Sequence, residues 1–246
     1  MDRLWNRYSE ELLSYNVDGD FGRQMSLVMR YPALRHRYNH LRGLPSDSNV
    51  LDIGSGTGRS FLYLAKMLRP DLNYYAMDIH NSLIPELGQQ VTFVKCDLDS
   101  GEASLEGKTF RYIVSINVLE HIRNPLNLFN QAFDCLEAKG TFLLETAHPR
   151  SISAGKLLPR TLQRGDGYVN FYDDPTHIRP YTQKALEHLA ILSGFGSYRS
   201  YIKREPLYVL ALPYFVMKYL VGFQSWDLAQ INLIVRGTNV GIVCGK

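Results

Sequence analysis

The chain has 246 residues, 45% of them hydrophobic, which is enough to bury one substantial core. Its 27 lysines and arginines against 24 aspartates and glutamates leave a net charge of +3, too small to indicate a nucleic-acid-binding surface. Three cysteines without CxxC spacing indicate neither a disulfide framework nor a thiolate metal site. We therefore expect a single domain over residues 1–246 that stays in the cytoplasm and has no nucleic-acid partner.

The first 44 residues carry a helical pattern. Apolar side chains recur at helical spacing in two stretches, Leu4, Trp5, Tyr8 and Leu12, then Tyr31, Leu34, Tyr38 and Leu41. Residues 1–44 are therefore predicted to form a helical cap over the ligand cleft of the domain.

From residue 49 onward, short β-rich runs alternate with helical patterns, which predicts a parallel sheet. The predicted core, residues 45–145, contains strands at 49–53, 73–77, 91–94, 112–116 and 141–145. A helix is expected from Phe61 to Leu68, and a second through Leu136, with Asn124 as its N-cap and Pro125 in its first turn.

Residues 146–180 lose this periodicity, and loops of such length are usually functional or disordered, so we assign them as a substrate loop. Thr182 then caps a last helix that stops at Gly194, and strands are expected near 198–202 and 240–244. Residues 204–238 form an insertion between those two strands. Its apolar part, 207–223, is interrupted and falls short of the roughly 20 residues of a membrane span.

Polar residues end the first four predicted strands: Asp52 in the first, then Asp78, Asp97 and Asn117. In an open parallel sheet, ligands bind outside the carboxyl ends of the strands. These four side chains are therefore expected to meet in one cleft.

Glycines 54, 56 and 58 follow the first strand and allow a tight turn that a ligand can approach closely. A dinucleotide fingerprint requires glycine at position 59, where this chain has Arg59. The spacing DxGxGxG suits a cationic amino-acid cofactor instead. Asp52 would pair with an α-ammonium group, Asp78 would accept hydrogen bonds from ribose hydroxyls, and Asp97 would accept one from an adenine amino group.

Four segments, 50–58, 76–78, 95–98 and 117–122, together resemble class I S-adenosylmethionine-dependent methyltransferases over roughly residues 45–200. The resemblance implies an α/β fold with a doubly wound, seven-stranded, mostly parallel sheet whose last strand is antiparallel. Segment 174–181 is similar to one in methyltransferases that act on sugars and other small molecules. The implied S-adenosyl-L-methionine-binding residues are Asp52, Gly54, Ser55, Gly56, Thr57, Gly58, Asp78, Ile79, Asp97, Leu98 and Asn117.

Methyl transfer to a hydroxyl requires alignment and the removal of one proton, a task that suits histidine. His121, His148 and His177 are the candidate catalytic residues, and Arg150 and Arg179 are candidates to bind an anionic part of the substrate. Residues 117–120 lack the Asn-Pro-Pro-aromatic signature of base and amide methylation. No metal-ligand spacing accompanies the histidines, so no metal is predicted. The leading hypothesis is O-methylation of a small molecule or glycan.

Two alternatives stay open. A lipid-linked or quinone-type substrate would use the aromatic segment 207–226 for peripheral contact with a membrane. A module that keeps the methyltransferase fold without catalysis would bind only the cofactor or a partner chain. The sequence is compatible with a monomer or a homodimer.

Overall fold

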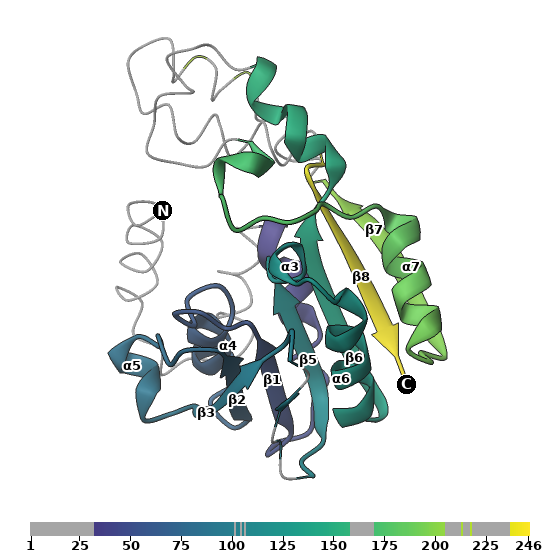
Figure 1. The fold of residues 1–246 in the computed structure, drawn as a ribbon. Helices are drawn as coiled ribbons and strands as arrows, with labels where there is room; N and C mark the ends of the chain where they lie inside the picture. Colours follow the sequence, from purple (N-terminus) through teal and green to yellow (C-terminus); the bar gives the residue numbers. More distant parts are fainter. Residues whose placement is uncertain are drawn as a thin grey trace.

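The computed structural model describes residues 32–100, 102, 103, 105, 107–157, 170–204, 213, 217 and 237–246. They form one sheet in the order β4-β3-β2-β1-β5-β6-β8-β7 (Figure 1). The seven longer strands are β1 (Asn49–Ile53), β2 (Asn73–Asp78), β3 (Thr92–Asp97), β5 (Phe110–Ile116), β6 (Leu136–Ala147), β7 (Ser197–Lys203) and β8 (Asn239–Gly245).

The strand directions confirm the predicted doubly wound sheet. Strands β3, β2, β1, β5 and β6 pair in parallel, whereas β8 is antiparallel to both β6 and β7. The eighth strand, β4 (Glu102–Ala103), is a two-residue antiparallel addition to β3 that the sequence pattern did not predict. Each of the seven predicted strands is present, with bounds that shift by a few residues.

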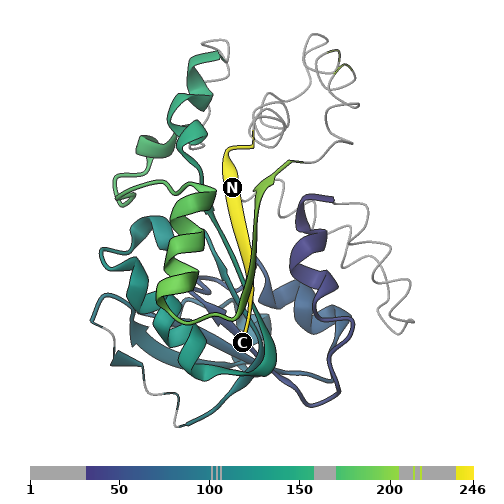
Figure 2. The same ribbon diagram turned by 90° about the vertical axis from the view of Figure 1, so that its right-hand side faces the viewer.

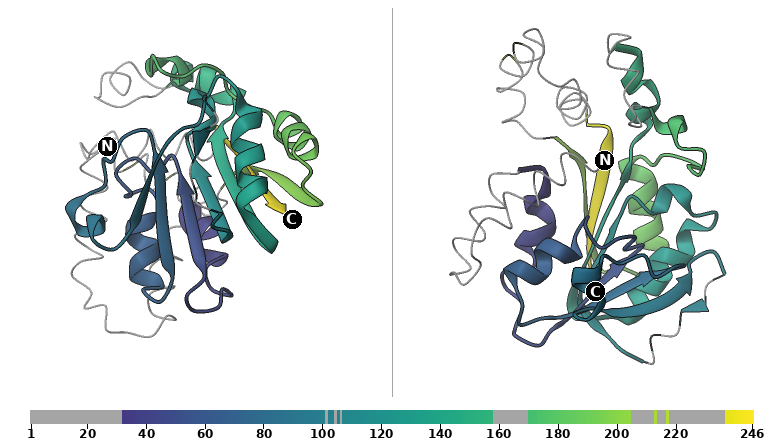
Figure 3. Two further views of the ribbon diagram at one scale, coloured as in Figure 1. Left: turned by 60° about the horizontal axis from the view of Figure 1, so that its bottom comes forward. Right: turned by 90° about the vertical axis from the view of Figure 1, so that its left-hand side faces the viewer.

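Helices cover both faces of the sheet. Figure 2 shows α3 (Pro32–Asn39) on one side and α7 (Gln183–Leu192) on the other. The views in Figure 3 place α4 (Leu62–Leu68) on the first side and α6 (Pro125–Cys135) on the second. The short α5 (Pro85–Gly88) lies between β2 and β3 in the chain. Of the predicted cap, α3 is described, and residues 1–31 lie outside the described part of the chain.

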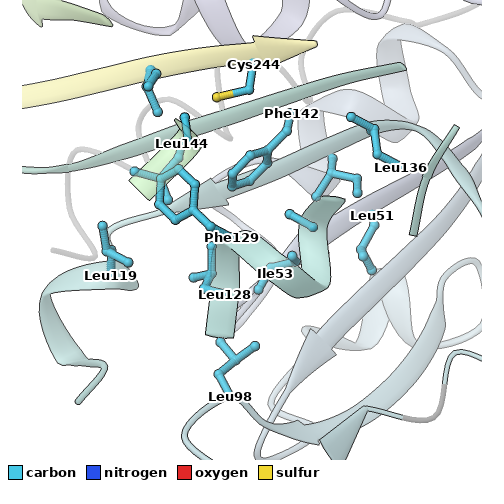
Figure 4. Close-up of a cluster of buried hydrophobic side chains, with 14 of the residues drawn as sticks. Leu51, Ile53, Leu98, Leu119, Leu128, Phe129, Leu136, Phe142, Leu144 and Cys244 are labelled. Atoms are coloured by element: carbon cyan, nitrogen blue, oxygen red, sulfur yellow. The ribbon is translucent and has the colours of Figure 1, made fainter. Parts of the chain in front are cut away.

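Each face of the sheet has its own hydrophobic core, because successive strand residues point to opposite sides. On the α6 and α7 side, Leu51 and Ile53 of β1 pack with Phe129 and Phe142 (Figure 4). On the α3 and α4 side, Val50 joins a second cluster of buried side chains, which includes Tyr38, Phe61, Leu62, Tyr74 and Tyr112.

Local capping differs from the prediction at one helix and agrees at another. Asn124 stands at the N-cap of α6, but its amide donates to Asn127 Oδ1 at 3.1 Å instead of capping. Thr182 does cap α7, since its hydroxyl accepts from the Ala185 amide at 3.2 Å. Gly194 ends that helix with φ of +87°, a conformation suited to glycine.

Segment 146–180 contains more regular structure than the predicted loop. Strand β6 continues to Ala147, and two 3-10 helices follow, η2 (Pro149–Leu157) and η3 (Phe171–Asp173). They lie beyond the carboxyl ends of the parallel strands (Figure 1). Most of the predicted insertion 204–238 is outside the described residues, and among those described, no helix is long and apolar enough to cross a membrane.

Candidate functional site

A cavity of about 260 Å³ opens at the carboxyl ends of β1, β2, β3 and β5, where the sequence predicted a cleft. Seven predicted site residues line it: Gly54, Asp78, Ile79, Asp97, Leu98, Asn117 and His121. The lining residues that the sequence reasoning missed are Cys96, Asp99, Val118 and Ile122. Each of them is adjacent to, or two residues from, a predicted one, so the four motifs already marked this region.

The loop after β1 needs its glycines for two different reasons. All three glycines have positive φ, namely +72° at Gly54, +52° at Gly56 and +79° at Gly58. A Cβ at Gly54 would lie 2.2 Å from a methyl group of Val118, whereas a Cβ at Gly56 would meet nothing within 4 Å. The first glycine therefore permits close packing, and the open space at Gly56 permits close approach of a ligand.

Asp78, at the end of β2, ties the loop to the sheet. Its Oδ2 accepts from the Gly56 amide at 2.8 Å, and its Oδ1 accepts from the Ile79 amide at 2.7 Å. Each carboxylate oxygen has a further lone pair and the residue lines the cavity, so Asp78 can still accept from ribose hydroxyls.

Asp52 lies beneath the loop and is only 2% exposed, so it does not line the cavity. Its Oδ2 has no hydrogen-bond partner among the described residues. Burial raises the pKa of Asp52 to about 8; nearby Arg37 opposes the shift and Asp78 adds to it. A carboxyl group in this state fits a cationic ligand group, which would compensate for the cost of burying its charge.

Asp97 and Asn117 have the positions that the prediction gave them, at the ends of β3 and β5. Asp97 lines the cavity, and its Oδ1 accepts from the Asp99 amide at 3.0 Å. Asn117 has φ of +54°, a left-handed conformation that asparagine tolerates and that often marks a functional position. Asp99 is structural, because its Oδ1 accepts the Arg123 and Asn124 amides at 2.8 and 3.2 Å.

His121 is the predicted catalytic histidine that lines the cavity, and a chain of hydrogen bonds fixes its ring. Thr176 Oγ1 lies 2.9 Å from His121 Nδ1 and 2.5 Å from Asp174 Oδ1. Because a carboxylate only accepts, the single hydroxyl proton of Thr176 goes to Asp174. His121 Nδ1 must therefore donate to Thr176, and His121 Nε2 carries the lone pair.

His177 lies beside His121, with ring centroids 4.7 Å apart. Its Nδ1 donates to the Phe171 carbonyl at 2.6 Å, which leaves Nε2 of this ring as an acceptor too. Glu120, buried next to both histidines, accepts from the Thr146 hydroxyl at 2.6 Å. Burial raises the pKa of Glu120, against the opposing effects of the Thr146 hydrogen bond and the two histidines.

The remaining predicted site residues are not among the cavity's lining residues. His148 Nδ1 accepts from the Arg150 amide at 3.1 Å, which places its proton on Nε2, and burial together with Arg150 and Arg204 lowers its pKa. Arg150 is exposed. Arg179 donates to the Tyr181 hydroxyl at 3.0 Å and to the Arg123 carbonyl, so part of its guanidinium fork fastens the loop to the segment after η1 (Leu119–His121).

The strand order of the seven long strands, the glycine loop and the acidic strand ends define a Rossmann-like methyltransferase fold. The chain belongs to the methyltransferase-domain family, whose model matches residues 22–196, and is an S-adenosylmethionine-dependent methyltransferase. No curated protein matches the sequence.

Solved structures show the same fold at low identity. A SAM-dependent methyltransferase from Archaeoglobus fulgidus has 19% identity and a TM-score of 0.58, with 96% of this chain and 99% of that chain covered. One from Mesorhizobium loti has 17% identity and a TM-score of 0.56, with coverages of 94% and 100%. Phosphoethanolamine N-methyltransferase 2 from Haemonchus contortus, in complex with S-adenosyl-L-methionine, has 17% identity and a TM-score of 0.58; 88% of this chain matches about half (52%) of it.

Proposed function

We propose that this methyltransferase methylates a hydroxyl oxygen of a small molecule or glycan. The observation that carries the proposal is His121, which lines the cavity and whose ring is held through Thr176 and Asp174 with Nε2 as its acceptor nitrogen. A hydroxyl acceptor must lose a proton during methyl transfer, and an imidazole lone pair at the acceptor side favours that loss.

The reaction balances without any further co-reactant. The O–H bond breaks and its proton leaves for the histidine side of the cavity. A lone pair on the acceptor oxygen forms the new O–CH3 bond. The electron pair of the broken C–S bond stays on sulfur, so the sulfonium of the cofactor becomes a neutral thioether. The main contribution of the protein is to align the acceptor oxygen with the methyl group. In that arrangement His121 lies near the acceptor oxygen.

The experiment that tests the proposal is methyl transfer from isotopically labelled S-adenosylmethionine to a panel of alcohols, sugars and amines, with the methylated atom located by NMR. We expect O-methylated products. His121→Ala should lower kcat by about 100-fold or more, since general acid–base groups contribute about that much. The control is His188→Ala, an exposed position on α7 that should retain full activity. Methyl groups found only on nitrogen or carbon, or an undiminished rate in His121→Ala, would contradict the proposal.

A lipid-linked or quinone-type acceptor is the second candidate. It keeps one observation in its favour: Met217, in the aromatic segment 207–226, is 61% exposed. An apolar side chain held in solvent can contact a bilayer surface. Flotation of the protein with neutral and anionic vesicles separates the two candidates, and a protein that stays at the bottom of the gradient in both cases rules out the membrane-bound form.

A further inference from the structure

We propose that Glu120, His121 and His177 bind one divalent transition-metal ion at the acceptor side of the cavity. One ligand atom from each of the three side chains lies within 4.8 Å of the other two. The sequence predicts no metal site, because its histidines lack ligand spacing. The fold supplies the site by bringing the segment before α7 against η1, with the Ile178 amide donating to the Glu120 carbonyl at 2.8 Å.

The hydrogen bonds of the two histidines leave the same nitrogen available in each ring. His121 Nδ1 donates to Thr176, and His177 Nδ1 donates to the Phe171 carbonyl, so the lone pair is on Nε2 in both. His177 Nε2 lies 3.9 Å from Asp174 Oδ2, which is beyond hydrogen-bonding distance. Metal-binding histidines usually donate their second nitrogen to a carbonyl, a carboxylate or water; His177 donates to a carbonyl, and His121 donates to a hydroxyl that is itself bonded to a carboxylate.

Glu120 completes the set with a negative charge. Glu120 is only 2% exposed, and the Thr146 hydroxyl donates a hydrogen bond to its Oε2 at 2.6 Å. Each imidazole thus has one acceptor nitrogen, and one ligand atom of each of the three side chains lies within 4.8 Å of the other two. A buried charge needs a compensating partner, and a cation between these groups provides one.

Two imidazoles and one carboxylate suit Zn²⁺, Mn²⁺, Fe²⁺ or Co²⁺ and leave coordination positions open. Ligand distances of about 2.1 Å require the three atoms to move closer together when an ion binds. Of the three ligands, His121 lines the cavity together with Asn117 and Val118, so we expect the open positions on the cavity side.

This inference rests on the proposed function and names its substrate class. A metal ion here would bind an acceptor with two adjacent oxygens, such as a vicinal diol, a catechol or a 2-hydroxy acid. It would lower the pKa of the bound hydroxyl, and because the lone pair of His121 would then be on the metal ion, the O–H proton would pass to water instead of the imidazole before the O–CH3 bond forms. A single general base would need only one of the two histidines, whereas metal binding uses both.

The test is titration of chelator-treated protein with Co²⁺, followed by visible absorption and equilibrium dialysis. We expect one ion per chain, at least 100-fold weaker binding in His177→Ala and Glu120→Gln, and unchanged binding in the control His188→Ala. Thr176→Val removes the hydroxyl that accepts from His121 and donates to Asp174, leaves the three ligands in place, and should weaken binding by about 10- to 100-fold. Circular dichroism and titration with S-adenosylhomocysteine check that each variant is folded and keeps its cofactor site.

The metal-binding measurement requires neither cofactor nor acceptor, so it can contradict the metal site without contradicting the proposed function. Absence of a Co²⁺ spectrum, or equal affinity in wild type and His177→Ala, overturns the metal site. Full-rate methylation of a diol by metal-free protein overturns its role in activation, while O-methylation itself would stand. Stoichiometric binding without any methylated hydroxyl would support the site and contradict the proposed function.

Discussion

At the scale of single residues, Asp52 carries the clearest sign of a missing ligand. It is buried, one of its oxygens has no partner among the described residues, and burial raises its pKa to about 8. At pH 7 the group is therefore mostly protonated in the protein without cofactor. A nearby cation would stabilise the ionised form and expel the proton.

We predict that cofactor binding at pH 7 releases protons in a manner that depends on Asp52. Calorimetric titration in two buffers of different ionisation enthalpy should show roughly 0.5 to 1 more proton released by the wild type than by Asp52→Asn, because the amide has no proton to lose. The variant should also bind S-adenosylmethionine about 10- to 100-fold more weakly, the cost of a lost charge-assisted interaction.

Asp134→Asn, at an exposed position of α6, is the matched control and should behave as the wild type. Equal proton release from wild type and Asp52→Asn would show that Asp52 stays neutral in the complex. In that case the carboxyl group of Asp52 does not form an ion pair with a cationic group of the cofactor.

At the scale of elements, α7 is positioned by its N-terminus. The Tyr181 amide donates to the Ala147 carbonyl at 2.8 Å, which ties the start of the helix to the end of β6. One residue later, Thr182 caps the helix, and Leu186 and Ala190 bury its inner face against the sheet. The helix therefore fixes where the preceding segment, with Asp174, Thr176 and His177, meets η1.

Thr182→Ala should destabilise the protein by about 1 kcal/mol, the usual value of an N-cap, and lower Tm by about 2–4 °C. Thermal unfolding followed by circular dichroism measures the change. Thr109→Ala, in an exposed loop, provides the comparison and should leave Tm nearly unchanged. Equal melting temperatures for both variants would mean that the Thr182 hydroxyl does not stabilise α7.

At the scale of the whole molecule, Glu145 joins distant parts of the chain. Its Oε2 accepts from Arg37 on α3 at 2.6 Å and from Lys203 at the end of β7 at 2.7 Å, and all three side chains are buried. The Tyr201 hydroxyl donates to Oε1 at 3.2 Å. Burial alone would raise the pKa of Glu145, but Arg37 and Lys203 outweigh it and lower the pKa to about 2.

Glu145→Gln should lower the free energy of unfolding by about 3–5 kcal/mol, because it leaves two buried cations without their carboxylate. The lowered pKa makes this stabilisation fully present above the ordinary glutamate value of about 4.5 and lost as the pH falls toward 2. Urea unfolding of wild type and variant from pH 7 to pH 3 should therefore show a difference that shrinks with acidity.

The control is Glu137→Gln, which removes a partly exposed partner of Arg111 at 3.9 Å and should cost less than about 1 kcal/mol. A stability difference between wild type and Glu145→Gln that does not change with pH would show that the carboxylate charge is not what stabilises the cluster.

The sequence by itself determined the sheet, the glycine loop and the cofactor, because these follow from local patterns. Alternating apolar runs predict strands such as 49–53, positive φ requires glycines 54, 56 and 58, and a polar residue ends each strand at the same edge. Errors were local, as at Asn124, whose amide bonds a neighbouring side chain instead of capping.

Only the tertiary structure decided which histidines meet. His121, His148 and His177 are equivalent candidates in the sequence, yet two of them lie together beside Glu120, while the third has its Nδ1 occupied by the Arg150 amide. Likewise, nothing local pairs Glu145 with Arg37 and Lys203. Such contacts depend on how loops and helices far apart in sequence pack on the sheet, and short-range periodicity carries no information about that packing.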